Sequence, residues 1–241
     1  MKKYALLVLS IATFALVANS QNLLKDGDFS STSIGNFKLG STSYVNISSS
    51  RNSWGGQCTT QDDDATPAKI GVVSDEGTVN KCVSFTRGTT KPGPISPATY
   101  LYQRLSASAQ LSTTKTYKLL FKAKSINSNQ SCFFYIRNRA ATKFAVRADF
   151  KYDVNEIWGW CIYRSSIPTT WTEYSQTFVF SNSVFATSVI SSTQPAALTS
   201  PVPFTEAELK DLVVCFYSNS AEGGTIYIDD VVFEEVPGSS K

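Results

Sequence analysis

Aromatic and arginine side chains alternate along two short segments of the sequence. Tyr100, Tyr102 and Arg104 would share one side of an extended chain, and so would Tyr135 and Arg137. Alternate residues of a β-strand face the same way, so each segment would place aromatic rings beside a guanidinium group. Rings of this kind stack on the apolar faces of sugars, and arginine donates hydrogen bonds to hydroxyl groups. The alternative is a face covered by a long loop, with arginine stacked on tyrosine.

Three tryptophans lie in polar, loop-like surroundings. Trp54 falls within Asn52–Gly56, and Trp158 and Trp160 flank a glycine. On a strand, Trp158 and Trp160 would face the same way and, if exposed, would form a stacking platform. We therefore take all three as candidate ligand-binding residues. The alternative is that they anchor loops to the core, because tryptophan is mostly buried in folded proteins.

Composition excludes several kinds of catalytic and metal site. The 241 residues contain no histidine, which removes Ser-His-Asp and Cys-His catalysis and histidine-ligated zinc. Hydrophobic residues make up 42% and charged residues 17%, which is typical of a chain that folds around a core. Without Lys2 and Lys3, 20 basic and 19 acidic residues remain. Such a balance gives no electrostatic reason to expect nucleic acid or a membrane surface as partner.

The first 20 residues have the pattern of a signal peptide. Met1–Lys3 is positively charged, Tyr4–Val17 is largely apolar, and Ala18–Ser20 places small residues ahead of a cleavage before Gln21. The apolar run is shorter than the roughly 20 residues of a transmembrane helix. We expect a mature protein that is secreted, periplasmic or held at the cell surface, with no membrane insertion. An uncleaved anchor helix is the alternative.

The rest of the chain is predicted to be one all-β domain over residues 21–236, with a polar tail at 237–241. Period-two alternation indicates strands at 117–124, 132–137, 171–180, 213–217 and 225–234, with weaker ones at 23–29, 82–87 and 100–105. A helix is expected only at 205–212, with Thr205 as its N-cap. Short strands separated by polar clusters favour an antiparallel β-sandwich.

Three polar segments, 50–80, 141–170 and 184–203, are expected to be long loop insertions on this frame. Long loops on a rigid sandwich are where binding residues are commonly found. Five cysteines are present but form no CxxC motif, so neither a redox motif nor a zinc knuckle is indicated. Cys58 with Cys82 is the first disulfide to consider, and Cys132 could pair with Cys215 only if their strands are neighbours. Buried thiols are the alternative.

Four segments, taken in chain order, resemble one group of proteins. They are Asn22–Phe29 (N-L-L-K-D-G-D-F), Tyr117–Ser125 (Y-K-L-L-F-K-A-K-S), Trp171–Phe178 (W-T-E-Y-S-Q-T-F) and Ile226–Phe233 (I-Y-I-D-D-V-V-F). Together they resemble strands of the carbohydrate-binding modules of families 4, 9, 16 and 22, which are galactose-binding-like jelly rolls. The resemblance implies this jelly-roll sandwich and an oligosaccharide or polysaccharide ligand. It is more specific for fold than for function, because the same jelly roll also serves adhesins and structural modules.

The resemblance also implies a structural calcium ion. Many relatives hold it with an acidic residue after the first Phe, where this chain has Ser30, and with the first Asp of the closing strand. Asp229 matches the second position, and Asp28 is a possible substitute for the first. Calcium takes about six to eight oxygen ligands, of which the sequence supplies these two side chains. The alternative is that Asp229 accepts backbone hydrogen bonds at a strand end.

Three function classes follow. The first is an exported, non-catalytic protein that binds a glycan through an aromatic-lined groove. The second is a structural or adhesive surface module that binds a protein. The third is a glycan-active enzyme, because a glycosidase needs two carboxylates and no histidine, and Asp149, Asp153 and Glu156 are candidate acids. The oligomeric state is left open.

Overall fold

A computed structural model describes residues 21–37, 50–58, 69–75, 79–86, 99–127, 130–149, 162–185, 202–218 and 224–238. Within these ranges the chain forms twelve strands and one short helix, and the strand pairings between them are antiparallel. The elements are β1 (Gly35–Asn36), β2 (Trp54–Cys58), β3 (Lys69–Ser74), β4 (Lys81–Thr86), β5 (Thr99–Arg104), β6 (Thr116–Ser125), β7 (Gln130–Asn138), β8 (Lys143–Arg147), β9 (Ile162–Ile167), β10 (Thr172–Phe185), α2 (Glu206–Leu209), β11 (Leu212–Ser218) and β12 (Thr225–Glu235).

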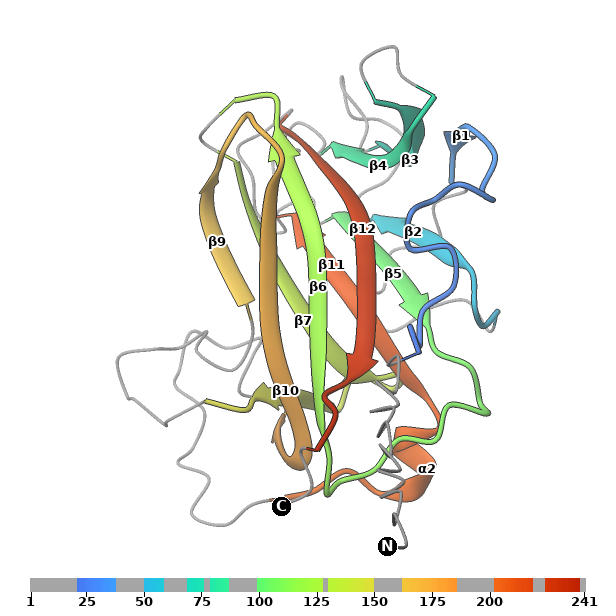
Figure 1. Cartoon of the computed structure of the whole chain (residues 1–241), viewed down its shortest axis with the longest axis vertical. Helices are drawn as coiled ribbons and strands as arrows, with labels where there is room; N and C mark the ends of the chain where they lie inside the picture. The colour runs from blue at the N-terminus through green and yellow to red at the C-terminus, as the bar shows by residue number, and fades with distance from the viewer. Residues whose placement is uncertain are drawn as a thin grey trace, which may run out of the picture.

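The strands pack in two layers (Figure 1). The first layer has the order β1-β3-β4-β12-β6-β10, and the second has the order β8-β7-β11-β5-β2, with β9 paired to β7. Strand β10 joins the layers, because it pairs with β6 and also with β8, with a register shift between Val179 and Ser183. Figure 1 shows β6, β10 and β12 in front of β5, β7 and β11. The fold is therefore the all-β, antiparallel jelly-roll sandwich that the sequence predicts.

The core lies between the layers and follows the predicted alternation. Tyr117, Leu119 and Phe121 on β6 face inward and are at most 1% exposed. Phe121 lies 4.1 Å from Phe134 and 5.4 Å from Phe216, ring centre to ring centre, and both partners belong to the second layer. Each buried aromatic side chain contributes roughly 1.5–3 kcal/mol to folding. Within the described residues, aromatic side chains from both layers therefore help to hold the two layers together.

The predicted strand at 23–29 is wrong. The segment runs beside the end of β12 as a series of bends and turns. The side chain of Asn22 replaces backbone hydrogen bonds that a paired strand would make with β12. Its Oδ1 accepts from Phe233 N at 3.0 Å, and its Nδ2 donates to Val231 O at 3.1 Å. The backbone of Gly27 then approaches the bulge of β12, where Val231 N donates to Gly27 O at 2.9 Å. Sequence alternation could not reveal this, because side-chain hydrogen bonds replace those of a regular strand.

Two of the expected insertions contain strands. Strands β2 and β3 lie within 50–80, and β8 and β9 lie within 141–170. Cys82, Cys132 and Cys215 are buried thiols, so neither disulfide considered from the sequence is present. Strands β7 and β11 are neighbours, yet Cys132 faces the core whereas Cys215 belongs to a second cluster on the other side of the sheet. In the ranges given above, no helix combines the length and apolarity needed to cross a bilayer.

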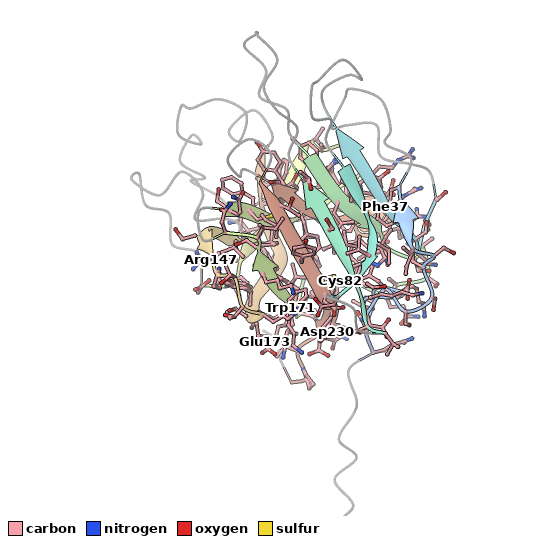
Figure 2. The ribbon with its side chains drawn as sticks, turned by 90° about the horizontal axis from the view of Figure 1, so that it is seen from above. Phe37, Cys82, Arg147, Trp171, Glu173 and Asp230 are labelled. Carbon is pink, nitrogen blue, oxygen red and sulfur yellow. The ribbon has the colours of Figure 1, made fainter. Side chains whose placement is uncertain are left out.

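A carboxylate from the β3–β4 hairpin fastens the outer face of the first layer. Asp75 accepts a hydrogen bond from Lys124 Nζ at 2.8 Å and another from Trp171 Nε1 at 2.9 Å. The Lys124 side chain is only 6% exposed, and its Nζ lies 5.0 Å from the centre of the Trp171 ring and 5.4 Å from that of Tyr227. Figure 2 shows Trp171, Glu173 and Asp230 on this same side of the sandwich. We call Asp75, Lys124 and Trp171 the hairpin latch.

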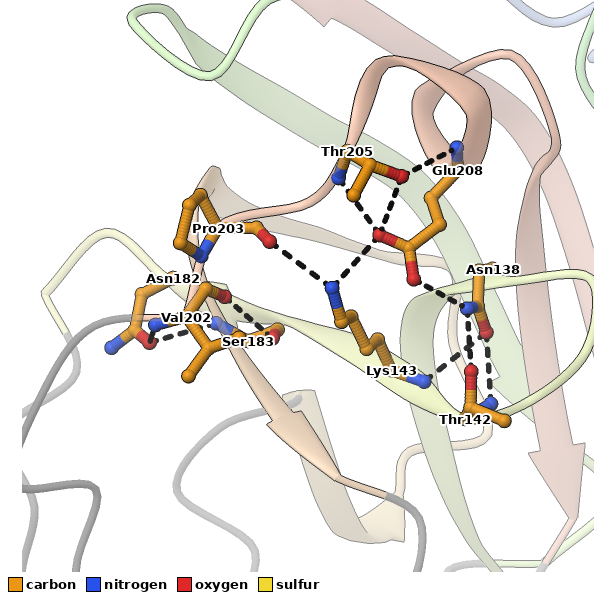
Figure 3. Close-up of polar contacts among 9 residues, drawn as sticks. All are labelled: Asn138, Thr142, Lys143, Asn182, Ser183, Val202, Pro203, Thr205 and Glu208. Carbon is orange, nitrogen blue, oxygen red and sulfur yellow. Dashed lines mark hydrogen bonds and ion pairs between the residues drawn. The ribbon is translucent and has the colours of Figure 1, made fainter.

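The predicted helix start at Thr205 is confirmed. Thr205 Oγ1 accepts from Glu208 N at 3.3 Å, and the Glu208 carboxylate accepts from Thr205 N at 2.8 Å, which is a capping box. Lys143 Nζ adds an ion pair to Glu208 at 2.9 Å and donates to Pro203 O at 3.1 Å (Figure 3). Asn138 Nδ2 also reaches Glu208, at 3.3 Å. One carboxylate therefore joins α2 to the β7–β8 turn.

Replacing Glu208 with glutamine should lower the free energy of unfolding by about 1–2 kcal/mol at neutral pH. Burial raises the pKa of Glu208, but hydrogen bonds from Thr205 and the Lys143 ammonium outweigh it, so the pKa is lowered below its usual 4.5. A carboxyl group whose pKa is lowered by folding stabilises the fold at pH values above its pKa in the unfolded chain. This stabilisation is lost as the pH falls through its pKa in the folded protein. Urea unfolding from pH 7 down to pH 3 should show the two proteins converging in acid. If the difference in unfolding free energy between the two proteins grew below pH 4.5, the predicted direction of the pH dependence would be wrong.

Candidate functional site

The predicted aromatic and arginine residues come together on one face. Strand β11 lies between β5 and β7, and the register aligns the three strands in rows across the second layer. We call this side of β5, β11 and β7, which faces away from the core, the outer face of the second layer. Its rows are Tyr100–Tyr217–Phe133, Tyr102–Cys215–Tyr135 and Arg104–Val213–Arg137. Alternation alone had grouped five of these nine side chains as candidates.

The most accessible part of this face is a row of stacked rings. Tyr100 and Tyr217 lie 4.9 Å apart with their planes 21° from parallel, and Phe133 continues the stack 5.6 Å from Tyr217 at 15°. Tyr100 and Tyr217 are half-buried, whereas Phe133 is 6% exposed. We call these three residues the aromatic row. Tyr217 was missed as a candidate, although its alternation with Cys215 and Val213 within a predicted strand could have placed it here.

The other two rows are not an open surface. Tyr102 and Tyr135 are 6% and 7% exposed, and they belong to a second apolar cluster with Phe144, Val146 and Val213. Burial raises the pKa of Tyr135 well above its usual value. These residues therefore correct the expectation of an exposed groove along the whole face. The sequence shows which side chains share a face but not what covers that face.

The guanidinium groups of both arginines bind other groups of the protein. Arg104 Nε lies 2.5 Å from Asp211 Oδ1, and Arg104 is 8% exposed. Arg137 is 2% exposed and its Nη1 donates to Arg139 O at 3.0 Å. A guanidinium held in this way is not directed at a ligand from solvent. Direct glycan contact through Arg104 or Arg137 therefore stays a prediction, and the burial of both side chains does not favour it.

Trp54 is also placed differently from the prediction. It is 8% exposed, its ring lies 5.2 Å from Phe29 and 6.2 Å from Phe216, and its Nε1 donates to Asp26 O at 2.8 Å. Trp54 therefore anchors the segment after Gln21 to the core, which is the alternative that the sequence left open. Trp158 and Trp160 lie outside the described residues, as do Asp153 and Glu156.

Asp229 and Asp28, the residues implied for calcium, accept hydrogen bonds from protein donors. Asp229 is 4% exposed, and its carboxylate accepts from Asp230 N at 2.7 Å and Asn80 Nδ2 at 2.9 Å. Burial raises the pKa of Asp229 to about 6. Asp28 is exposed and accepts from the hydroxyl and amide of Ser30 at 3.0 and 3.3 Å. Within the described ranges, no three acidic, cysteine or histidine residues cluster in a way that could hold a metal ion.

Asp149, one of the candidate acids of an enzyme, is paired with a cation. It accepts hydrogen bonds from Arg147 at 2.9 and 3.1 Å and from Gln176 at 2.9 Å. The Arg147 guanidinium lowers the pKa of Asp149 below its usual value. A general acid of a glycosidase needs a raised pKa, so this environment is the opposite of what that role requires.

Comparison with solved structures finds the same fold elsewhere. A crystal structure of a "putative sugar binding protein" from Bacteroides thetaiotaomicron VPI-5482 is 20% identical with a TM-score of 0.65, and the match covers 90% of this chain and 100% of that one. The module TmCBM61, solved with β-1,4-galactotriose, is 12% identical with a TM-score of 0.42, covering 90% and 100%. The CBM22-1 xylan-binding domain from Paenibacillus barcinonensis is 12% identical with a TM-score of 0.39, covering 77% and 86%.

Neither a protein-family model nor a curated protein matches the sequence. At these identities a structural match shows a common fold, and the two lower TM-scores add nothing on function. The resemblance to carbohydrate-binding modules that four segments of the sequence carry therefore holds at the level of the fold.

Proposed function

We propose that this chain is an exported, non-catalytic carbohydrate-binding protein. The aromatic row of Tyr100, Tyr217 and Phe133 is the observation that supports this most strongly. Because the three rings stack on one another, Tyr217 lies between Tyr100 and Phe133, and the row can offer a pyranose ring its edges, its phenol hydroxyl groups and the face of Tyr100 that is turned away from Tyr217. The fold shared with the "putative sugar binding protein" from Bacteroides supports the same function.

Three further features agree with this proposal. The signal-peptide pattern of the first 20 residues supports export to a compartment where glycans are met. The cation-paired environment of Asp149 supports binding without hydrolysis. The stack of rings runs across β5, β11 and β7, which are rigid neighbouring strands, so the aromatic row is held in place before a ligand arrives. We place the glycan at the Tyr100–Tyr217 end of the row.

A glycan-array screen, followed by fluorescence titration of each hit, tests the proposal. Tyr217→Ala should weaken glycan binding at least tenfold, because it removes the central ring of the row. The matched control is Tyr227→Ala, since Tyr227 is an equally half-buried tyrosine on the outer face of the first layer. The control should bind like the original protein. Circular dichroism of both variants distinguishes lost binding from lost folding.

Two results would count against the proposal. If Tyr217→Ala and Tyr100→Ala both keep full affinity for a glycan that the protein binds, the aromatic row is not the site. If no plant, microbial or host glycan binds at all, the protein is better described as a surface module with a protein partner.

A further inference from the structure

The amino group of Lys81 contacts the loop where the resemblance implies calcium. The loop is Asp26–Thr32, which packs against the bulge of β12 through the bond from Val231 N to Gly27 O. Lys81, the first residue of β4, extends its side chain to this loop from the first layer. Its Nζ donates to Ser30 O at 2.8 Å and to Thr32 O at 2.9 Å. Two backbone carbonyls of the loop thus converge on one positive charge.

The carboxylates around this point accept hydrogen bonds from protein donors. Asp26 accepts from Ser31 N at 2.7 Å and from the hydroxyl of Thr32. Asp28 and Asp229 accept from Ser30, Asp230 and Asn80, as described above. Calcium would need several of these oxygens at once, at about 2.3–2.6 Å. The local oxygens are instead arranged for N–H and O–H donors.

Asn80 and Lys81, the residue before β4 and its first residue, supply two adjacent donors to this region. Asn80 satisfies the buried carboxylate of Asp229, and Lys81 satisfies the carbonyls of Ser30 and Thr32. An ammonium group is a compact cation with three N–H donors, so it can neutralise converging carbonyl dipoles as a metal ion would. The absence of an acidic residue at position 30 fits the same picture, because a lysine cation needs no additional negative charge there.

We propose that the Lys81 ammonium replaces the structural metal ion of this loop, so that the fold of this chain is independent of calcium. The lysine ties the loop to β4 and thereby holds the segment that carries Gly27 and Phe29 against the core. A covalently attached cation is present at all calcium concentrations. The stability of the protein should therefore not vary with the calcium content of its surroundings.

Thermal unfolding of the full chain in calcium chloride and in EDTA tests this inference. The melting temperature should be the same in both solutions, and titration calorimetry with calcium chloride should give no binding heat. Lys81→Met should lower the melting temperature by about 3–6 °C in both solutions. The matched control is Lys118→Met, because Lys118 makes a 3.3 Å ion pair with Glu234 on the same layer and is 34% exposed. That variant should melt within about 1 °C of the original protein.

Other outcomes would overturn the inference. A lower melting temperature in EDTA would show that a metal ion is bound in addition to, or instead of, the lysine contact. A Lys81→Met variant that melts like Lys118→Met would show that the ammonium does not hold the loop. Neither result depends on whether the protein binds a glycan.

Discussion

Asp75→Asn is expected to lower the free energy of unfolding by about 2–4 kcal/mol, because it removes the negative charge of a carboxylate that is hydrogen-bonded to the buried Lys124 ammonium. Asp75 accepts a hydrogen bond from Lys124 at 2.8 Å and another from Trp171 at 2.9 Å. Asparagine keeps the size of the side chain but offers one acceptor oxygen in place of two. The hairpin latch would then lose its charge pairing while its packing stays nearly unchanged.

The effect of Asp75→Asn should depend on pH with a definite sign. The hydrogen bond from Lys124 lowers the pKa of Asp75 below its usual 3.8. The contribution of Asp75 to stability is therefore complete at pH values above its pKa in the unfolded chain. It is lost as the pH falls through the lower pKa that Asp75 has in the folded protein. Guanidinium unfolding at pH 7 should show the full loss, and the difference from the original protein should shrink below about pH 3.8.

A matched ion pair provides the control for Asp75. Lys122 and Asp230 pair at 2.7 Å on the same face, but their side chains are 45% and 48% exposed. Asp230→Asn should cost no more than about 0.5 kcal/mol, because exposed ion pairs are screened by water and salt. Equal losses for Asp75→Asn and Asp230→Asn would show that burial of Lys124 does not set the strength of the latch.

Gly27→Ala should destabilise the protein by about 3 kcal/mol, because the new Cβ would lie only 2.0 Å from Val231 O. The obstructing atom is backbone, so no side chain can rotate away to make room. The neighbouring residues add constraint, since Asp26 and Phe29 already adopt positive φ values of 52° and 54°. Moving the two backbone segments apart to remove this clash would break the hydrogen bond from Val231 N to Gly27 O.

Gly238→Ala is the control for Gly27→Ala. Gly238 has a φ of +72° and nothing within 4 Å of the position of a Cβ. Alanine there would meet backbone strain alone, at a cost of about 1 kcal/mol. Thermal and urea unfolding of the two variants should separate them clearly. If the two losses were equal, the close approach of the N-terminal segment to β12 would have no part in stability.

The strands were predictable because their side chains alternate between two different environments. Tyr117–Lys124 shows this best, with lysines on the face opposite the aromatic core residues, and the structure extends that strand by one residue at each end. The helix start was predictable for another reason, since Thr205 and Glu208 have the types and the spacing of a capping box. In both cases the information is local in the sequence.

The candidate site was predictable only in part, because it depends on contacts between distant segments. Tyr100 and Tyr135 were correctly assigned to one face, but strand β11, which lies between their strands and carries Tyr217, was not recognised as part of the site. The burial of Trp54 follows from its packing on Phe29 and Phe216, and the role of Lys81 follows from a loop some 50 residues earlier. No pattern of neighbouring residues records such pairings.

The described residues on either side of positions 186–201 are fastened to each other by hydrogen bonds. Asn182 Oδ1 accepts from Val202 N at 3.1 Å, Ser183 Oγ donates to Val202 O at 2.7 Å, and Phe204 N donates to Phe180 O at 3.0 Å. The cost of closing a flexible loop grows slowly with its length, by about 0.6 kcal/mol for each doubling. With the flanking residues held together in this way, we expect a peptide tag or a small domain inserted between positions 186 and 201 to leave the strand register of the sandwich unchanged.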